Sequence, residues 1–145
     1  MDEPKSLKMI VRPWLAMVTL LCLCGPAASA QAPVLTPSSV TTFMGTWPLT
    51  MTNPEGAHET VRIWDDSGVV KASVQSGRFP AINATGILKD GDVLVLTLTR
   101  FENGKADRAV IALTLDGDTM NMAQMLEFSQ TIKRGSGKRA EQSRP

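Results

Sequence analysis

Short polar turns that contain glycine recur at near-regular intervals along the chain. Glycine adopts positive φ without steric cost, so each cluster supplies the chemistry of a hairpin loop. The segments between the turns are short and rich in β-branched and aliphatic residues, and no window after residue 30 shows the 3.6-residue period of a long helix. The pattern therefore predicts an all-β chain. The six turns are 53–56, 65–68, 76–77, 89–92, 102–105 and 116–118.

The six turns separate seven predicted strands, and a closing strand at about 128–135 makes eight. The first strand places Trp47, Leu49 and Met51 on one face, and residues 93–99 likewise align three leucines. A meander of eight strands would expose two unpaired edges, and closure into a barrel removes them. The sequence therefore predicts a short eight-stranded antiparallel up-and-down barrel, with a seven- to eight-stranded β-sandwich as the alternative. The predicted strands are 45–52, 57–65, 69–75, 80–88, 92–101, 106–115, 119–126 and about 128–135.

Residues 1–30 have the three parts of a secretory signal peptide. Three basic residues precede the apolar run 14–24, and Ala28-Ser29-Ala30 supplies small residues for cleavage near Ala30. The run of 11 residues is shorter than the roughly 20 that a membrane span needs. We therefore expect an exported protein, periplasmic or secreted, without a transmembrane segment. Lipidation at Cys24 is the alternative, although the large Leu23 precedes that cysteine.

Removal of the signal peptide changes the cysteine content and the charge distribution of the chain. Both cysteines belong to residues 1–30, so the remaining chain has neither a disulfide nor a thiol nucleophile. Residues 31–132 carry seven bases and eleven acids, whereas residues 133–145 carry five bases and Glu141. A net charge near zero gives no electrostatic support for nucleic acid as a partner.

The composition divides the rest of the chain into three parts. Residues 31–44, with two prolines among small residues, predict an extended leader. Residues 45–135 contain the alternating segments and form the predicted barrel. Residues 136–145 predict a basic, disordered tail.

The opening of the first strand resembles a known family motif. Gly45-Thr46-Trp47 is similar to the Gly-x-Trp that begins the barrel in lipocalins, avidins and other calycin-type proteins. The layout from residue 45 to Arg134 also resembles small exported bacterial lipocalin-like domains, mostly of unassigned function. The resemblance implies that Trp47 closes one barrel end together with Gly45, and that Arg134 covers the indole ring, as a cation–π contact.

Three local features of the sequence bear on possible chemistry. His58 is the only histidine, and without a second histidine or a cysteine it lacks the ligands that zinc needs. Met120, Met122 and Met125 resemble a thioether site for Cu(I), but filling the interior explains the same residues. The stretch 135–139 lacks the first glycine of a phosphate loop. We therefore expect no cofactor and no catalytic residue.

The sequence thus favours a non-enzymatic exported barrel that binds a small apolar ligand or an envelope protein. An alternative function is a periplasmic protease inhibitor that acts through its N-terminal arm. A third is a structural envelope protein whose basic tail binds anionic polymer. The residues expected to line the interior and contact a ligand are Trp47, Leu49, Met51, Leu94, Leu96, Leu98, Met120 and Met122.

Overall fold

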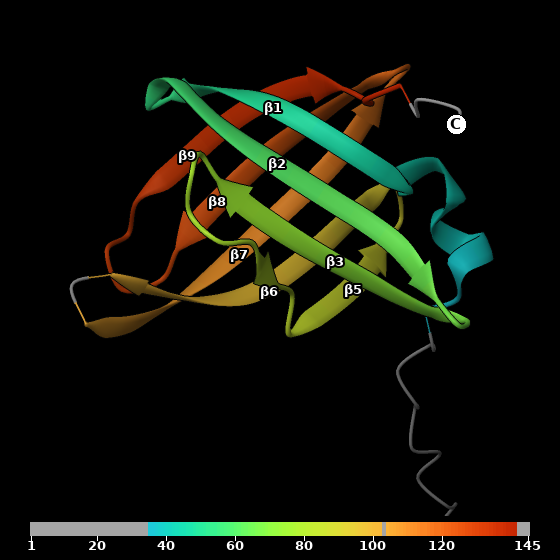
Figure 1. Ribbon diagram of the computed structural model, residues 1–145, viewed down its shortest axis with the longest axis horizontal. Helices are drawn as coiled ribbons and strands as arrows, with labels where there is room; N and C mark the ends of the chain where they lie inside the picture. Colours follow the sequence, from blue (N-terminus) through green and yellow to red (C-terminus); the bar gives the residue numbers. More distant parts are fainter. Residues whose placement is uncertain (1–34, 103, 142–145) are drawn as a thin grey trace, which may run out of the picture. The chain divides into compact units, whose positions relative to one another are not determined.

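A computed structural model describes residues 35–102 and 104–141 (Figure 1). The predicted signal peptide and its cleavage site lie outside these residues. One short 3-10 helix, η1 (Pro37–Phe43), precedes the strands. The strands are β1 (Gly45–Asn53), β2 (Glu55–Asp66), β3 (Val69–Ser76), β4 (Ile82–Asn83), β5 (Gly86–Asp90), β6 (Val93–Glu102), β7 (Lys105–Asp116), β8 (Thr119–Leu126) and β9 (Ile132–Lys138).

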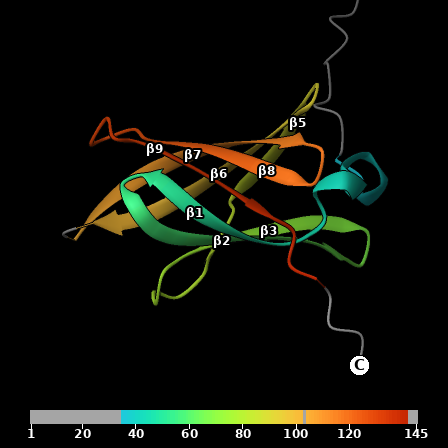
Figure 2. The ribbon, with the colours of Figure 1, turned by 90° about the horizontal axis from the view of Figure 1, so that it is seen from above.

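The described strands form one antiparallel sheet in the order β4-β3-β2-β1-β9-β8-β7-β6-β5. Strands that are consecutive in the chain are neighbours, except for β4 and β5, and β1 also pairs with β9. Both views show the sheet curled strongly into a half-barrel (Figures 1 and 2). The all-β, up-and-down prediction is confirmed, and a single sheet replaces the two sheets of the sandwich alternative.

The two edges of this sheet, β4 and β5, follow each other in the chain. The backbone N–H of Ala84 donates to Ala72 on β3, and the next N–H, of Thr85, donates to Thr97 on β6. The predicted strand 80–88 is therefore present as two short strands that bridge the two halves of the sheet. Because the two edge strands are short and follow each other in the chain, the meander closes without leaving a long unpaired sheet edge exposed to solvent.

Apolar side chains from alternate positions fill the inside of the curled sheet. On β7, for example, Ala109, Ile111 and Leu113 are fully buried, and the residues between them are not. The eight residues predicted to line the interior all belong to this core, each at most 3% exposed. Burial of such side chains is worth about 1.5–3 kcal/mol apiece relative to exposure.

The helix η1, Trp47 and Arg139 cover one end of the barrel. We call this end the capped end. Val40 and Phe43 of η1 are buried, and Trp47 Nε1 donates to the Phe43 carbonyl oxygen at 2.8 Å. The prediction of an extended leader is therefore wrong for residues 37–43. A hydrophobic contact with the barrel, invisible in local sequence, orders this segment.

Arg139, and not Arg134, covers the indole of Trp47. The Arg139 guanidinium carbon lies 4.7 Å from the ring centroid, and Nη2 donates to the Thr42 carbonyl oxygen. Gly45 has φ +123°, and a Cβ there would approach Arg139 Cδ to 3.3 Å, so the missing side chain leaves room for the arginine.

The prediction that Arg134 covers the Trp47 ring is wrong, because it assumed the wrong inward-facing positions on β9. It required Ile132 to face inward, but Ile132 is 49% exposed, and Arg134 is exposed as well. Gly135 is the buried residue of β9, so the inward positions are the odd-numbered ones that lead to Arg139. A shift of one residue moves every side chain of a strand to the other face. The predicted disordered tail likewise starts too early, because β9 continues to Lys138.

Candidate functional site

The predicted interior site is filled by the protein's own side chains. Leu94, Leu96 and Leu98 have no solvent-exposed surface, and Trp47 and Met51 are 1% exposed. A ligand at this position would have to displace packed core atoms. The structure places these residues together in the packed core, an arrangement that supports stability.

Surface grooves occur near the capped end. One, of about 530 Å³, is lined by residues of η1, by Thr46 and Trp64, and by Ala140. Arg62 lies over the Trp64 ring there, 5.1 Å from its centroid. Neither this groove nor its neighbour beside Lys89 and Arg139 is lined by the three interior leucines of β6.

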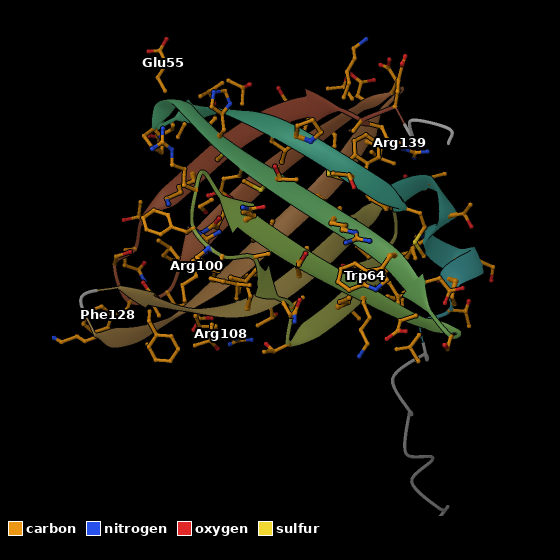
Figure 3. All side chains as sticks on the ribbon, in the orientation of Figure 1. Glu55, Trp64, Arg100, Arg108, Phe128 and Arg139 are labelled. Atoms are coloured by element: carbon orange, nitrogen blue, oxygen red, sulfur yellow. The ribbon has the colours of Figure 1, made fainter. Side chains whose placement is uncertain are left out.

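The end opposite the cap carries exposed phenylalanines, and we call it the phenylalanine end. It is formed by the connections β1–β2, β3–β4, β6–β7 and β8–β9, and Figure 3 shows Phe128 and Arg139 at opposite ends of the molecule. Phe79, Phe101 and Phe128 are 74%, 77% and 71% exposed, and Ile132 is 49% exposed. Large apolar side chains exposed together at one end of a soluble protein indicate an interaction site.

Local geometry explains why these rings face solvent. Phe101 follows the inward positions Leu96, Leu98 and Arg100, so alternation turns it outward. Phe128 lies in the β8–β9 connection, where its backbone N–H donates to Asp107 Oδ1 at 2.8 Å. Asp107 is 3% exposed, so a buried carboxylate fixes the backbone that presents the Phe128 ring.

Buried polar residues lie behind this end of the barrel. Arg100, drawn in Figure 3, donates from Nη1 to Ser76 Oγ at 2.9 Å and from Nη2 to Glu59 Oε2 at 3.4 Å. Ser76 Oγ also donates to Glu59 Oε1 at 3.0 Å. Because Glu59 is 4% exposed, this ion pair is largely removed from water and removal of one partner would be costly.

Gln124 adds an amide group to the barrel interior. It is 1% exposed, and among the described residues neither its side-chain nitrogen nor its oxygen has a hydrogen-bond partner. Arg100 Nε is unpartnered in the same way. Sequence reasoning missed this polar group, although Glu59, Asp107 and Gln124 stand at inward positions of their strands, where alternation makes a polar residue conspicuous.

Charge differs between the two ends. The three capped-end turns are flanked by aspartate pairs, at 65 and 66, 90 and 92, and 116 and 118. Lys138 donates to Asp118 Oδ2 at 2.9 Å, and this hydrogen bond holds the pKa of the carboxyl below its ordinary value. At the phenylalanine end, Arg78 lies in the β3–β4 connection and Lys105 begins β7, and the acidic residues Glu55 and Glu127 lie there as well.

The residues considered for chemistry do not converge. His58 is exposed on β2, and no group of three potential metal ligands occurs within residues 35–102 and 104–141. Met120 and Met122 are buried core residues, whereas Met125 is 43% exposed on the other face of β8. The three thioethers therefore do not form one Cu(I) site.

In the part of the chain that the structure describes, no helix has the length and apolar character to cross a bilayer. Comparison with known proteins adds nothing to this geometry: no family model, no curated protein and no solved structure matches the chain.

Proposed function

We propose that this protein is an exported, non-enzymatic binding domain of lipocalin-like type that engages its partner through the phenylalanine end. The Gly45-Thr46-Trp47 opening and the cap over Trp47 support the lipocalin-like assignment. The predicted signal peptide supports export. The barrel thus acts as a rigid frame, and binding residues lie on its connections, as is common in β-folds.

One observation carries this proposal: three phenylalanines, two in separate connections and one near the end of β6, are each more than 70% exposed at one end. Burial of a phenylalanine side chain is worth about 1.5–3 kcal/mol, so three offer roughly 5–9 kcal/mol. Association itself costs about 4–15 kcal/mol. The rings therefore suffice for weak binding, and other groups at this end must contribute to a stable complex.

The other functions have less support. A small apolar ligand inside the barrel would compete with packed side chains that are at most 3% exposed. A protease inhibitor would need a free N-terminal arm, but residues 37–43 form η1 and contribute to the core. In the basic segment after residue 132, Lys138 is paired with Asp118 and Arg139 covers Trp47, so two of the bases already have partners.

Site-specific photo-crosslinking in the cells that make the protein tests the proposal. Benzoylphenylalanine replaces Phe79, Phe101 or Phe128 in turn, with matched replacements of the exposed capped-end residues Lys71 and Asp116 as controls. We expect adducts from the phenylalanine positions and none from the controls. Absence of adducts from all three positions, or equal adducts from the controls, would contradict the proposal.

A further inference from the structure

We propose that the partner of the phenylalanine end is an anionic lipid surface, into which the rings insert while neighbouring cations contact the headgroups. This inference rests on the proposed function and names the class of its partner. It is drawn from the way apolar and cationic side chains are combined at this end, from the distribution of charge over the barrel, and from the shape of the surface.

Two of the exposed phenylalanines at this end have a cation beside them. Arg78 directly precedes Phe79 in the β3–β4 connection. Lys105 Nζ lies 5.4 Å from the centroid of the Phe128 ring, although Lys105 begins β7 and Phe128 lies in the β8–β9 connection. Apolar groups that enter the acyl region, with cations at headgroup level, are the combination that interfacial membrane binding uses.

Of the acidic side chains described at this end, two are withdrawn from the surface, and a third, 43% exposed, is paired. Glu59 and Asp107 are buried, and Glu127 pairs with Arg108 at 3.0 Å. Glu55 on the β1–β2 hairpin remains exposed (Figure 3). The aspartate pairs of the capped end lie at the far side of the barrel, so an anionic surface would attract the phenylalanine end and repel the other.

The shape of the surface favours a fluid partner over a protein. Hot spots in protein interfaces occupy packed pockets that exclude water from their rim. Here the rings of Phe79 and Phe128 project from two separate connections and the ring of Phe101 from the end of β6, each more than 70% exposed. Lipid chains can surround each projecting ring separately, without a complementary fixed surface.

Vesicle flotation tests the inference. The protein is purified from the cells that make it, and mass spectrometry defines its N-terminus. It is then floated with vesicles of phosphatidylcholine alone or with three parts phosphatidylglycerol to seven parts phosphatidylcholine, at low and high NaCl. We expect binding to the anionic vesicles at least ~10-fold tighter than to the neutral ones and weakened by salt, because exposed charges are screened within ~10 Å at 0.1 M.

Matched variants locate the contact. Combined Phe79→Ser, Phe101→Ser and Phe128→Ser should weaken binding to anionic vesicles at least ~10-fold, as expected where apolar insertion contributes. Val69→Ser with Leu88→Ser, which replaces apolar residues that are 53% and 52% exposed elsewhere, should leave binding unchanged. If unfolding curves show that the triple variant does not fold, the three single variants are compared instead.

A second pair of variants tests the cations. Arg78→Gln with Lys105→Gln should reduce both binding and its dependence on salt, whereas Lys71→Gln with Lys89→Gln should not. The inference is overturned if wild-type protein does not bind anionic vesicles, or if the phenylalanine variants bind as wild type does. Failure with vesicles together with crosslinks to a protein from positions 79, 101 and 128 would overturn the lipid inference and leave the proposed function standing.

Discussion

Arg139 and Trp47 together close one end of the barrel. The guanidinium group lies over the indole ring and also donates to a backbone carbonyl oxygen of η1, so one side chain connects β1, the helix and the end of β9. Arg134, five residues earlier, is exposed on the outer face of β9. The two arginines are therefore a natural pair for comparison.

Arg139→Gln is expected to lower the free energy of unfolding by about 1–2 kcal/mol, because it removes a cation–π contact and a hydrogen bond. Arg134→Gln should change it by less than about 0.5 kcal/mol, as is usual for exposed positions. Urea unfolding followed by tryptophan fluorescence measures both. An equal loss in the two variants would show that the contact with Trp47 does not stabilise the fold.

Gln124 presents the opposite case, a buried group that works against stability. Its amide is 1% exposed and unpartnered among the described residues, so it bears the desolvation penalty of a polar group without a compensating bond.

Gln124→Met keeps nearly the same volume and should raise the free energy of unfolding by about 1–2 kcal/mol. The exposed Gln75 on β3 provides the control, and Gln75→Met should have an effect below about 0.5 kcal/mol. The same urea curves report both values. A destabilised Gln124→Met protein would mean that the amide is bonded in solution.

Among the elements, β9 is defined by its glycines. A Cβ at Gly137 would overlap the carbonyl oxygen of Pro48, and a Cβ at Gly135 would lie 2.9 Å from the carbonyl oxygen of Thr50. In both cases the obstacle is the backbone of β1, which cannot rotate away. The two glycines therefore allow the first and last strands to approach each other closely.

Gly137→Ala should consequently destabilise the protein by about 3 kcal/mol or more, at or beyond the upper range of overpacking. Gly86→Ala is the matched control, because its nearest neighbour would be Thr97 Cβ at an ordinary 3.6 Å. That change should fall within about 1 kcal/mol of wild type. Thermal unfolding of the two variants distinguishes them, and similar melting temperatures would argue against close β1–β9 packing.

Elements differ in how far the sequence predicts them. Strands such as β6 and β7 follow from strict alternation between glycine turns, because one buried face imposes a period of two. The helix η1 has only Val40 and Phe43 as buried residues, so its order comes from long-range contact that no local pattern carries. The register of β9 has the same origin, and for this reason the sequence indicated Arg134 where the structure has Arg139.

The candidate site was less predictable than the fold. The prediction of an interior ligand site rests on eight residues, and all eight do face inward. Whether a cavity remains among them depends on packing density, which is a property of the assembled barrel and not of the local sequence. The phenylalanine end depends on bringing together phenylalanines as far apart in the chain as Phe79 and Phe128. In a meander, alternate connections lie at the same end of the sheet. The spacing of the turns therefore allows the grouping of these phenylalanines at one end to be predicted from the sequence.

For the whole molecule, the split strand is the weakest part of the closure. β4 pairs with β3 through only Ser73 and Val74, and β5 pairs with β6 alone. The strands β7 and β8, by contrast, are paired along their length on both sides. Local opening begins where few bonds and few buried contacts must break.

Native-state hydrogen exchange should therefore show the β4–β5 segment exchanging at least ~10-fold faster than the bonded amides of β7. Exchange followed by mass spectrometry at neutral pH resolves the two regions. Equal protection of both would indicate that the barrel opens only as a single cooperative unit.

The capped end also has a practical consequence. Pro37 and Ala140 line the same groove, and the N–H of Ala140 donates to Thr46, so the described chain enters and leaves the barrel on one side. A tag, fluorophore or sensor-chip attachment joined near either position would stand away from the phenylalanine end. Immobilised in this way, every molecule would present the same face to the solution, as an oriented reagent does.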